Sequence, residues 1–383
     1  MLNPVKLYLS LFFILLFNCC VFAQKENSLA ILISNSTPIL FEEYVINIPW
    51  TAVVEKSSLV AKFDFRLIDD STQKELPYQI EFRGQPSPQQ LLVQISVPPH
   101  AKKVIRLEKG SHSPFMTKTF CRYVPERKDD FAWENDRIAF RMYGKALEGT
   151  KENANGIDVW VKRTDQMVIN NRYQRGEYHI DHGDGMDYYH VGLSLGAGNI
   201  APIIDDSIYY PTNYRTWEIL DNGPLRSTFR LTYDAWNVAG KKVTMTKTVT
   251  LDAGMQLSRV ETAYAYDMVD TLPVAIGITR RKDPGTVLFD LSLGLMGYWE
   301  PSHLQHGTTG VGCIFLQPVA DIKITNNHFL ALLKTNKQTP LVYYTGAAWD
   351  KAKRITDSSA WFNYLTIIKQ QLANPLQIAI SPF

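Results

Sequence analysis

The fold class of this chain is decided by Arg226-Ser-Thr-Phe-Arg-Leu-Thr-Tyr233 and by Lys242-Val-Thr-Met-Thr-Lys-Thr-Val-Thr-Leu251, which follows it. In both segments apolar side chains alternate with Thr or Arg, which is the period of a strand with one packed face and one polar face. The segment from Gln256 to Tyr266 continues the pattern after the turn at Asp252-Ala253-Gly254. Together they predict an antiparallel meander, and a polar face of this kind suits a concave sheet that holds a sugar.

Shorter alternating segments come before the meander. The clearest are Val45–Ile48, Val60–Leu67 and Leu91–Val97, and turn residues separate them. They predict a small N-terminal β-sandwich over residues 24–113. The stretch Glu108–Pro114 is polar and rich in helix and strand breakers, so we expect the domain boundary there and a larger β domain that carries the site over residues 114–383.

A helix is predicted close to the C-terminus. Apolar residues recur there at helical spacing: Trp361, Tyr364, Leu365, Ile368 and Leu372. Ser358 or Ser359 is the expected N-cap, and Asn374-Pro375 ends the helix. The segment Leu376–Ile380 then predicts a closing strand.

The charge balance excludes some partners. The chain has 383 residues, with 40 Lys plus Arg against 38 Asp plus Glu. Such balance argues against nucleic acid or an anionic membrane surface as the main partner. It leaves room for a local basic cluster that binds an anionic oligosaccharide or polysaccharide.

The N-terminus is typical of a signal peptide. Lys6 precedes an apolar run from Leu7 to Phe17, and Val21-Phe22-Ala23 resembles a cleavage site, so we expect residues 1–23 to be removed. The run is too short for an integral membrane span. These features predict a periplasmic or secreted protein. A lipoprotein anchored at Cys19 is the less favoured alternative, because Asn18 fits that pattern poorly.

The cysteines of the mature chain leave two interpretations open. Cys121 and Cys313 remain after removal of the signal peptide. An exported protein can join two cysteines in a disulfide, but spacing in the sequence does not show whether they lie within bonding distance. The alternative is two separate buried thiols.

The stretch from Tyr178 to Gly198 combines glycine with groups that carry chemistry. Its glycines indicate sharp turns, so we expect a loop-rich segment that gathers imidazoles, carboxylates and phenols. Tyr188 and His190 are two residues apart and, in extended backbone, would point to the same side as general acid and general base. His182 is the reserve base, and Asp187 is a candidate substrate ligand. The alternative is that Tyr188 and His190 are ordinary structural residues.

A divalent metal site is an alternative use of the same stretch. The candidate ligands would be His179, Asp181, His182 and Asp187, whose types suit Zn²⁺, Mn²⁺ or Ca²⁺. No standard metal-site spacing is met, so the expectation is a site without a metal or other cofactor.

A second group of candidates lies from Arg122 to Arg137. A tryptophan beside polar donors is a common way of gripping a sugar, and Arg can clamp a carboxylate with two parallel hydrogen bonds. The candidates for substrate binding in this stretch are Arg127, Trp133, Glu134, Asn135 and Arg137. Arg215 and Trp299 are further candidates in two later polar segments. The alternative for the charged stretch is a solvated linker whose charges pair with one another.

One segment matches the motif of a serine nucleophile. Gly192-Leu-Ser-Leu-Gly196 fits the Gly-x-Ser-x-Gly pattern, which needs a strand before it and a helix after it. The following Asn199-Ile-Ala-Pro202 does not start a helix, so Ser194 is not expected to be a nucleophile.

Three blocks of this sequence resemble the bacterial family DUF4861, a domain of unknown function: Val124–Gly144, His182–Gly192 continued by Leu195–Gly198, and Asn222–Arg226. The resemblance implies an exported protein of a polysaccharide-degradation system. It also implies an antiparallel β-supersandwich similar to that of galactose mutarotases and several polysaccharide lyases, and a lyase or dehydratase role on glycans that contain uronic acid.

These observations lead to the hypothesis of a β-elimination on a uronic-acid-containing oligosaccharide that yields a 4,5-unsaturated uronate. Arg127, Arg137 or Arg215, with Asn135, would neutralise the carboxylate. His190 would take the C5 proton, and Tyr188 would protonate the leaving oxygen. The alternatives are a glycan-binding protein without activity and a sugar enzyme of the mutarotase or epimerase type.

Overall fold

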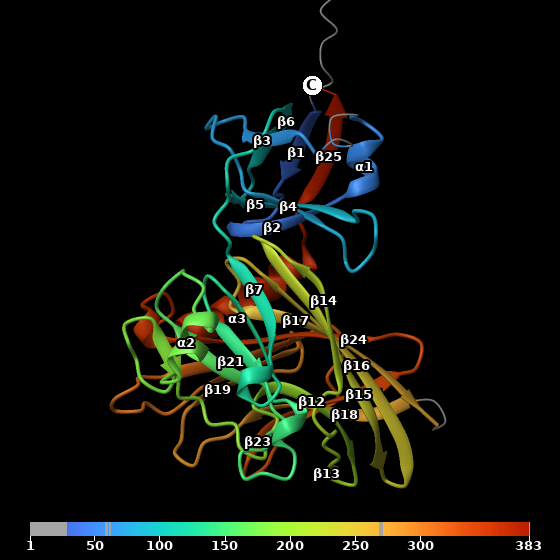
Figure 1. The fold of residues 1–383 in the computed structure, drawn as a ribbon, viewed down its shortest axis with the longest axis vertical. Coiled ribbons are helices and arrows are strands. Elements are labelled where there is room, and N and C mark those ends of the chain that lie inside the picture. Colours follow the sequence, from blue (N-terminus) through green and yellow to red (C-terminus); the bar gives the residue numbers. More distant parts are fainter. Residues whose placement is uncertain (1–28, 58–59, 61–62, 268–270, 383) are drawn as a thin grey trace, which may run out of the picture.

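A computed structural model describes residues 29–57, 60, 63–267 and 271–382, and it is drawn in Figure 1. The predicted signal peptide, residues 1–23, lies outside the described residues. The chain is mainly β, as predicted, with a small sandwich stacked on a larger body of antiparallel sheets (Figure 1). Among the described residues no helix is both long and apolar enough to cross a membrane.

The small sandwich has two sheets. The first has the strand order β25-β1-β6-β3, with β1 (Leu29–Ser34), β3 (Phe65–Asp69), β6 (Lys102–Lys109) and β25 (Gln377–Pro382). The second has the order β2-β5-β4, with β2 (Phe41–Pro49), β4 (Tyr78–Glu81) and β5 (Gln90–Val97), and the short helix α1 (Trp50–Val54) follows β2. The predicted strand at Val60–Leu67 begins only at Phe65, because Phe63 has a φ of 52°, which a strand does not allow.

The last strand of the chain returns to the first. The predicted closing strand exists as β25, and it pairs antiparallel with β1, with Ile31 opposite Ile380. Figure 1 shows the red β25 beside the blue β1 in the small sandwich. The sandwich at the N-terminus is therefore completed by the C-terminus, and the chain crosses between the two parts twice.

The larger body contains three antiparallel sheets. The widest has the order β14-β15-β16-β17-β24-β21-β20-β19, with β14 (Thr216–Asn222), β15 (Arg226–Val238), β16 (Lys241–Asp252), β17 (Leu257–Tyr266), β19 (Thr286–Asp290), β20 (Leu295–Trp299), β21 (Thr309–Phe315) and β24 (Leu341–Trp349). The second has the order β13-β12-β18-β23-β22, with β12 (Ala197–Ile204), β13 (Ser207–Ile208), β18 (Thr271–Thr279), β22 (Asp321–Ile324) and β23 (His328–Asn336). The third has the order β11-β10-β9-β8-β7, with β7 (Thr119–Val124), β8 (Asp130–Asn135), β9 (Ala139–Met142), β10 (Asp158–Lys162) and β11 (Gly185–Asp187). The predicted meander is confirmed as β15, β16 and β17.

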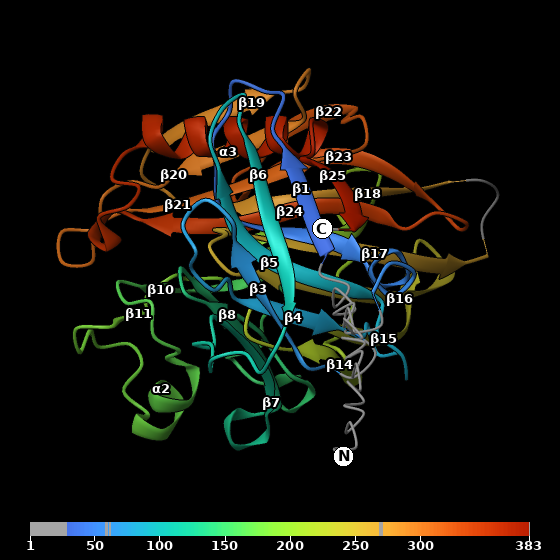
Figure 2. The same ribbon diagram turned by 90° about the horizontal axis from the view of Figure 1, so that it is seen from above.

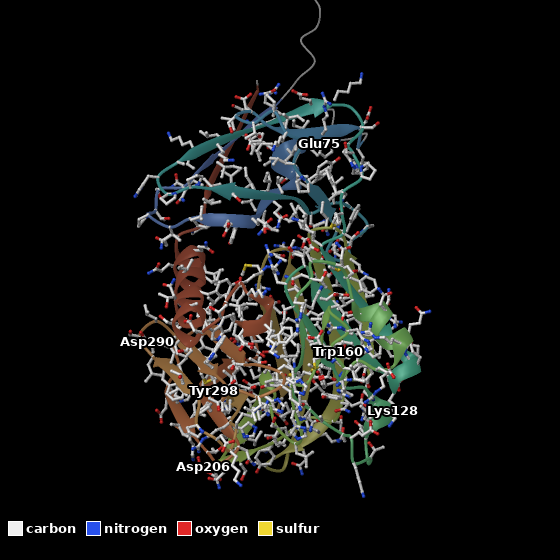
Figure 3. The ribbon with its side chains drawn as sticks, turned by 90° about the vertical axis from the view of Figure 1, so that its left-hand side faces the viewer. Glu75, Lys128, Trp160, Asp206, Asp290 and Tyr298 are labelled. Atoms are coloured by element: carbon white, nitrogen blue, oxygen red, sulfur yellow. The ribbon has the colours of Figure 1, made fainter. Side chains whose placement is uncertain are left out.

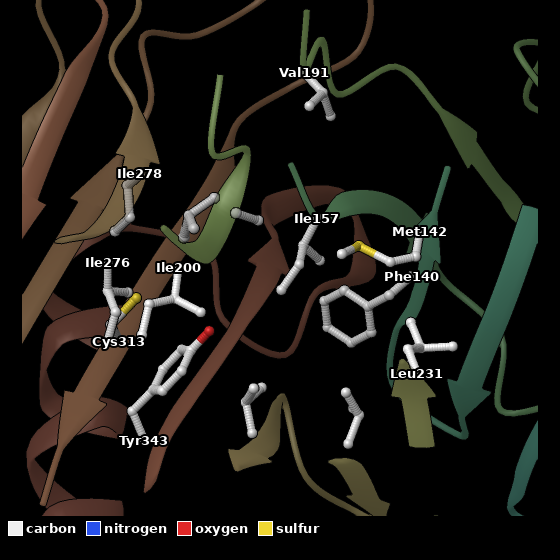
Figure 4. Packing of buried hydrophobic residues seen from close by; sticks show 14 of the residues in the cluster. Phe140, Met142, Ile157, Val191, Ile200, Leu231, Ile276, Ile278, Cys313 and Tyr343 are labelled. Atoms are coloured by element: carbon white, nitrogen blue, oxygen red, sulfur yellow. The ribbon is translucent and has the colours of Figure 1, made fainter. Parts of the chain in front are cut away.

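The main core lies between these sheets. Figure 4 shows Ile200, Ile276 and Tyr343 meeting from β12, β18 and β24, while Phe140 approaches from β9. Cys121 and Cys313 both belong to this core as free thiols. Burial raises the pKa of each thiol to about 12, so neither is a thiolate at neutral pH.

Two helices cover the larger body. Helix α2 (Ile169–Arg175) follows β10, and α3 (Ser358–Ala373) lies over β20 and β21, as Figure 2 shows from above. Helix α3 confirms the predicted helix, but its N-cap is Asp357, whose Oδ1 accepts from the Ala360 N–H at 2.9 Å. The helix packs tightly, since a Cβ added to Gly312 would lie 2.6 Å from Leu365.

One charged residue lies on the packed face of the meander. Lys247 alternates with Met245 and Val249, so the strand period turns its side chain into the core, where it is 1% exposed. Its Nζ donates to Asn199 Oδ1 and lies 5.5 Å from the centre of the Tyr233 ring. Burial lowers the pKa of Lys247 to about 7.

This buried lysine makes stability depend on pH. Between about pH 7 and about pH 10.4 the unfolded chain holds the Lys247 proton and the folded chain does not, so the free energy of unfolding rises with pH across that window. We expect Lys247→Met to remove this rise and to stabilise the protein at about pH 6, as measured by urea denaturation at several pH values. Lys242→Met, on an exposed side chain of the same strand, is the control. A rise that persists in Lys247→Met would contradict the assignment.

Candidate functional site

A cavity of about 390 Å³ opens where the loops around β11 approach the turn before β8. Its lining is Arg127, Arg141, Tyr143, Lys151, Glu152, Asn153, Ala154, His179, Asp187, Tyr189, His190, Val191 and Gly192. Arg127 comes from the charged stretch near residue 130, and His179, Asp187 and His190 come from the stretch near residue 185. The two sequence blocks therefore meet in one cavity, although only Arg127 represents the first.

Arg141 and Asp187, which line the cavity, belong to a buried group of charges on neighbouring strands. Arg141 of β9 lies directly opposite Asp158 of β10, and β11, which carries Asp187, is the next strand. Arg141 Nε donates to Asp158 Oδ2 at 2.9 Å, and its Nη2 donates to Asp187 Oδ2 at 3.0 Å. Asp130 Oδ2 lies 3.6 Å from Arg141 Nη1. Three carboxylates thus share one guanidinium, and all four side chains are at most 4% exposed.

Burial makes these carboxylates weaker acids than usual. It raises the pKa of Asp130 to about 7, although Arg141 and Arg127 oppose the change. Burial also raises the pKa of Asp158, and it raises that of Asp187 well above the ordinary value, with the neighbouring Asp158 adding to the effect. The nearby arginines do not offset the burial of three carboxylates, so protons remain in this group at pH values where exposed carboxyl groups have lost them.

Aromatic rings enclose the guanidinium of Arg141. Its Cζ lies 4.8 Å from the centre of the Tyr143 ring and 5.2 Å from that of Trp160. Tyr178 stacks on Trp160 with ring centres 4.9 Å apart. Figure 3 labels Trp160 inside the larger body and Lys128 at its periphery. The rings fix the orientation of Arg141 and exclude water from its carboxylate contacts.

Arg127 is held in the wall of the cavity by two hydrogen bonds. Its Nε donates to the Tyr178 hydroxyl at 3.0 Å, and its Nη2 donates to Glu152 Oε2 at 3.1 Å. Its Nη1 is buried and has no hydrogen-bond partner among the described residues. Nη1 is therefore closed off from a ligand, but the partner of Nη2, Glu152, is 55% exposed, so a ligand carboxylate can replace it there.

His179 and His190 are the two imidazoles of the cavity. His179 Nδ1 lies 2.8 Å from the backbone oxygen of Asp187, and because a carbonyl oxygen only accepts, Nδ1 carries the proton. In the neutral ring Nε2 then has the free lone pair that a general base needs. His190 lies on the exposed side of the same cavity, where Gly192, with a φ of 56°, leaves room for its ring.

Tyr143 is one of the two phenols that line the cavity, the other being Tyr189. Its hydroxyl accepts a hydrogen bond of 3.4 Å from Arg141 Nη2, which leaves its own proton free to be donated. Burial, with the nearby charge of Asp158, raises the pKa of Tyr143 well above 10. The phenol is therefore protonated at neutral pH and can act as an acid but not as a base.

Tyr188 does not face the cavity that His190 lines. Its hydroxyl lies 2.6 Å from Thr309 Oγ1, and its ring lies 5.3 Å from that of His306 and 6.5 Å from that of Trp349. The expectation that Tyr188 and His190 share one side assumed extended backbone. Residues 188–190 belong to no strand, so their side chains do not follow the strand alternation.

Three of the residues predicted to bind substrate are buried inside the protein: Trp133, Glu134 and Asn135. Trp133 is 1% exposed, and its Nε1 donates to Ser258 Oγ at 3.0 Å. Glu134 accepts from the backbone N–H groups of Val168 and Ile169 at the start of α2 and binds Lys162 Nζ at 2.7 Å. Asn135 Nδ2 donates to two backbone oxygens at 2.6 Å each. None of the three presents a free face to a ligand.

The remaining predicted residues lie outside the cavity. Arg137 pairs with Glu43 of the small sandwich, and Arg215 pairs with Glu148 and Asp234. Trp299 packs in the apolar cluster under α3. His182 Nε2 lies 3.6 Å from Glu177 and does not line the cavity.

The alternative metal site is not assembled. Asp181 binds Arg163 and the backbone N–H groups of Gly183 and Gly185, while His182 turns toward Glu177. Over the described ranges, no three His, Cys, Asp or Glu side chains come together as metal ligands. Ser194 is buried, and its hydroxyl donates to the Val191 backbone oxygen at 2.6 Å, which is the bond of a turn.

Sequence reasoning missed Arg141, Tyr143, Asp130 and Asp158. Arg141 and Tyr143 lie in the block that resembles DUF4861, but nothing local distinguished them from the charged residues around them. Asp158 had a usable signal, since it begins the apolar strand Asp158-Val-Trp-Val161, where a carboxylate is costly unless it is paired.

Comparison with known proteins identifies the family of this chain. The model of DUF4861, described as a domain of unknown function, matches residues 33–378, and the chain belongs to this family. "Uncharacterized protein P7" of Formosa agariphila is 31% identical over 340 residues, which are 83% of this chain and 85% of that protein.

Two solved structures from Enterococcus faecalis align with most of this chain. An alpha-mannosidase aligns with a TM-score of 0.47 and 10% identity over 92% of this chain. A protein in the Glycosyl Hydrolase Family 38 aligns with a TM-score of 0.48 and 12% identity over the same share. This chain spans 46% and 47% of their lengths. TM-scores below 0.5 carry no inference about its activity.

Proposed function

We propose that this protein is an exported carbohydrate-acting enzyme that performs β-elimination on a uronic-acid-containing oligosaccharide, as a lyase or a dehydratase. One observation carries the proposal. Arg127, whose Nη2 is paired with an exposed glutamate, lines the same cavity as two imidazoles and the protonated phenol of Tyr143. Elimination next to a carboxylate needs these groups: a cation for the carboxylate, a base for the adjacent proton and an acid for the leaving oxygen.

The roles follow from the contacts of each group. Arg127 binds the substrate carboxylate through Nη2, in place of the exposed Glu152, and draws charge toward it, so that the C5 proton becomes more acidic. His179 Nε2 takes that proton, the C4–C5 double bond forms and the C4–O bond breaks. Tyr143 gives its proton to the departing oxygen, as an alcohol in a lyase or as water in a dehydratase. Proton transfer from the imidazolium through solvent restores the phenol.

Two assignments differ from those that the sequence suggested. His179 replaces His190 as the base because its tautomer is fixed by the Asp187 backbone oxygen, and His190 remains a second imidazole at the mouth of the cavity. Tyr143 replaces Tyr188 as the acid because Tyr188 faces Thr309 instead of the cavity.

The activity is tested with purified protein and a panel of uronate oligosaccharides, followed at the ultraviolet band of the unsaturated product. We expect absorbance to rise with at least one member of the panel. Arg127→Ala is expected to lower kcat/KM by about 10- to 100-fold, because a charge-assisted hydrogen bond is lost. His182→Ala, which changes an imidazole outside the cavity, is the matched control and should leave the rate unchanged.

A flat absorbance trace across the whole panel, from protein that melts cooperatively, would overturn the proposal. Binding of an oligosaccharide without any product would instead identify a glycan-binding protein.

A further inference from the structure

A second cavity of about 400 Å³ lies between the small sandwich and the larger body. We call it the inter-domain cleft. Strands β2 and β4 form its upper wall, and β15, β16 and β17 form its floor, in the region where Figure 1 shows β2 above β14–β17. Its lining shares no residue with the candidate active site.

The floor of the cleft is the polar face of the meander. Register places Arg230 of β15 opposite Thr248 of β16, and Thr250 opposite Arg259 of β17. The hydroxyls of Thr228 and Thr250 lie 3.3 Å apart across β15 and β16. Hydroxyls and guanidinium groups in rows along a sheet match the alternating hydroxyl and carboxylate groups of an acidic sugar chain.

The arginines of the floor are held in two different ways. Arg226 is 5% exposed and is locked between Glu81, at 3.2 Å, and Asp252, at 2.8 Å. Arg230 and Arg259 have side chains that are 42% and 36% exposed, and each is paired with a glutamate that is itself exposed by 36% or more. Exposed ion pairs are weak, so a ligand carboxylate can replace these glutamates at little cost.

Other residues already join the two parts of the protein. Gln79 Oε1 accepts from the backbone N–H groups of Leu225 and Arg226, and the carboxylate of Asp221 accepts from those of Phe82 and Arg83. These contacts link β4 and the residues after it to β14 and the start of β15. Arg230 and Arg259 contribute to none of them, and their partners Glu218 and Glu261 belong to the larger body.

Two phenol rings complete the cleft. Tyr44 stands in the wall on β2, and Tyr344 lies in the floor on β24. Both are partly exposed, so each offers part of a ring to the apolar face of a sugar.

From this arrangement we infer that the inter-domain cleft is a second binding site for an acidic oligosaccharide chain, with Arg230 and Arg259 as the groups that bind its carboxylates. The inference takes its ligand class from the proposed function, but it does not depend on the chemistry at the first cavity. Such a site would hold a long chain on the protein while one of its residues occupies the active site, which raises the local substrate concentration.

Affinity electrophoresis tests the inference on the whole protein. Native gels contain pectate, alginate or hyaluronan as acidic probes, or dextran as the neutral reference. We expect wild-type protein and Arg127→Ala to be retarded by at least one acidic polymer and not by dextran. We expect Arg230→Ala/Arg259→Ala to bind about tenfold more weakly. Lys241→Ala/Lys242→Ala, at the exposed end of β16, removes the same charge away from the cleft and should bind as wild type does.

The outcomes separate this inference from the proposed function. The inference about the cleft is overturned if the Arg230/Arg259 variant is still retarded, or if only Arg127→Ala loses retardation. It is also overturned if no acidic gel retards the wild-type protein. Loss of retardation in the Arg230/Arg259 variant, with elimination of short oligosaccharides intact, supports it. If the Arg230/Arg259 variant loses retardation but no substrate gives an unsaturated product, the inference about the cleft is supported and the elimination proposal fails.

Discussion

Replacing Arg141 by methionine is expected to lower the free energy of unfolding by about 3–5 kcal/mol at neutral pH. The change leaves Asp130, Asp158 and Asp187 buried on neighbouring strands without their shared guanidinium. Methionine preserves much of the apolar packing against Tyr143 and Trp160, so the loss reports the charge rather than the volume. Urea denaturation monitored by fluorescence gives the value.

The pH dependence of this loss identifies its cause. Folding raises the pKa values of these carboxyl groups, so the folded protein holds more protons than the unfolded chain from about pH 4 to about pH 7. The contribution of the group to the free energy of unfolding therefore falls as pH rises through that window. The loss in Arg141→Met should therefore be smaller at about pH 5 than at about pH 8.

Arg163→Met is the control for this prediction. Arg163 pairs with Asp181 and lies over the Trp349 ring, but its side chain is 34% exposed, so its replacement should cost at most about 1 kcal/mol. Equal losses for the two variants, or a loss in Arg141→Met that does not change with pH, would show that the buried charges are not the cause.

Removing the proposed acid or the proposed base should reduce kcat by about 10²- to 10⁴-fold. Tyr143→Phe removes one hydroxyl, whose hydrogen bond with Arg141 is long at 3.4 Å, so the melting temperature should change little. His179→Ala removes an exposed ring and should likewise leave the fold intact. Initial rates of product absorbance, measured over a range of substrate concentrations, separate an effect on kcat from one on KM.

Tyr188→Phe distinguishes this assignment from the one that the sequence favoured. Its hydroxyl contacts Thr309 rather than the cavity, so the rate should stay near that of the wild type. If Tyr188→Phe loses activity and Tyr143→Phe does not, the acid is Tyr188 and the substrate lies on the other side of the loop. His190→Ala provides the same comparison for the base.

The two stretches that were predicted to form a site lie differently in the structure. The stretch around residue 185 was singled out by composition, and its His179, Asp187 and His190 do reach one cavity. The charged stretch around residue 130 was chosen for its tryptophan, yet Trp133 lies in the core because β8 is covered on both faces. An aromatic residue between polar neighbours is ambiguous in sequence, since a buried strand can pair its polar groups internally.

The sequence alone determined the class of fold, the strands of the meander and the C-terminal helix, because these follow from side-chain periods of two and 3.6 residues that act over short distances. Only the tertiary structure decided that β25 completes the N-terminal sandwich and that Arg141, Asp158 and Asp187 form one buried group. Both results depend on which strands become neighbours and in which register. That choice is made by packing between segments far apart in the chain, and no local pattern encodes it.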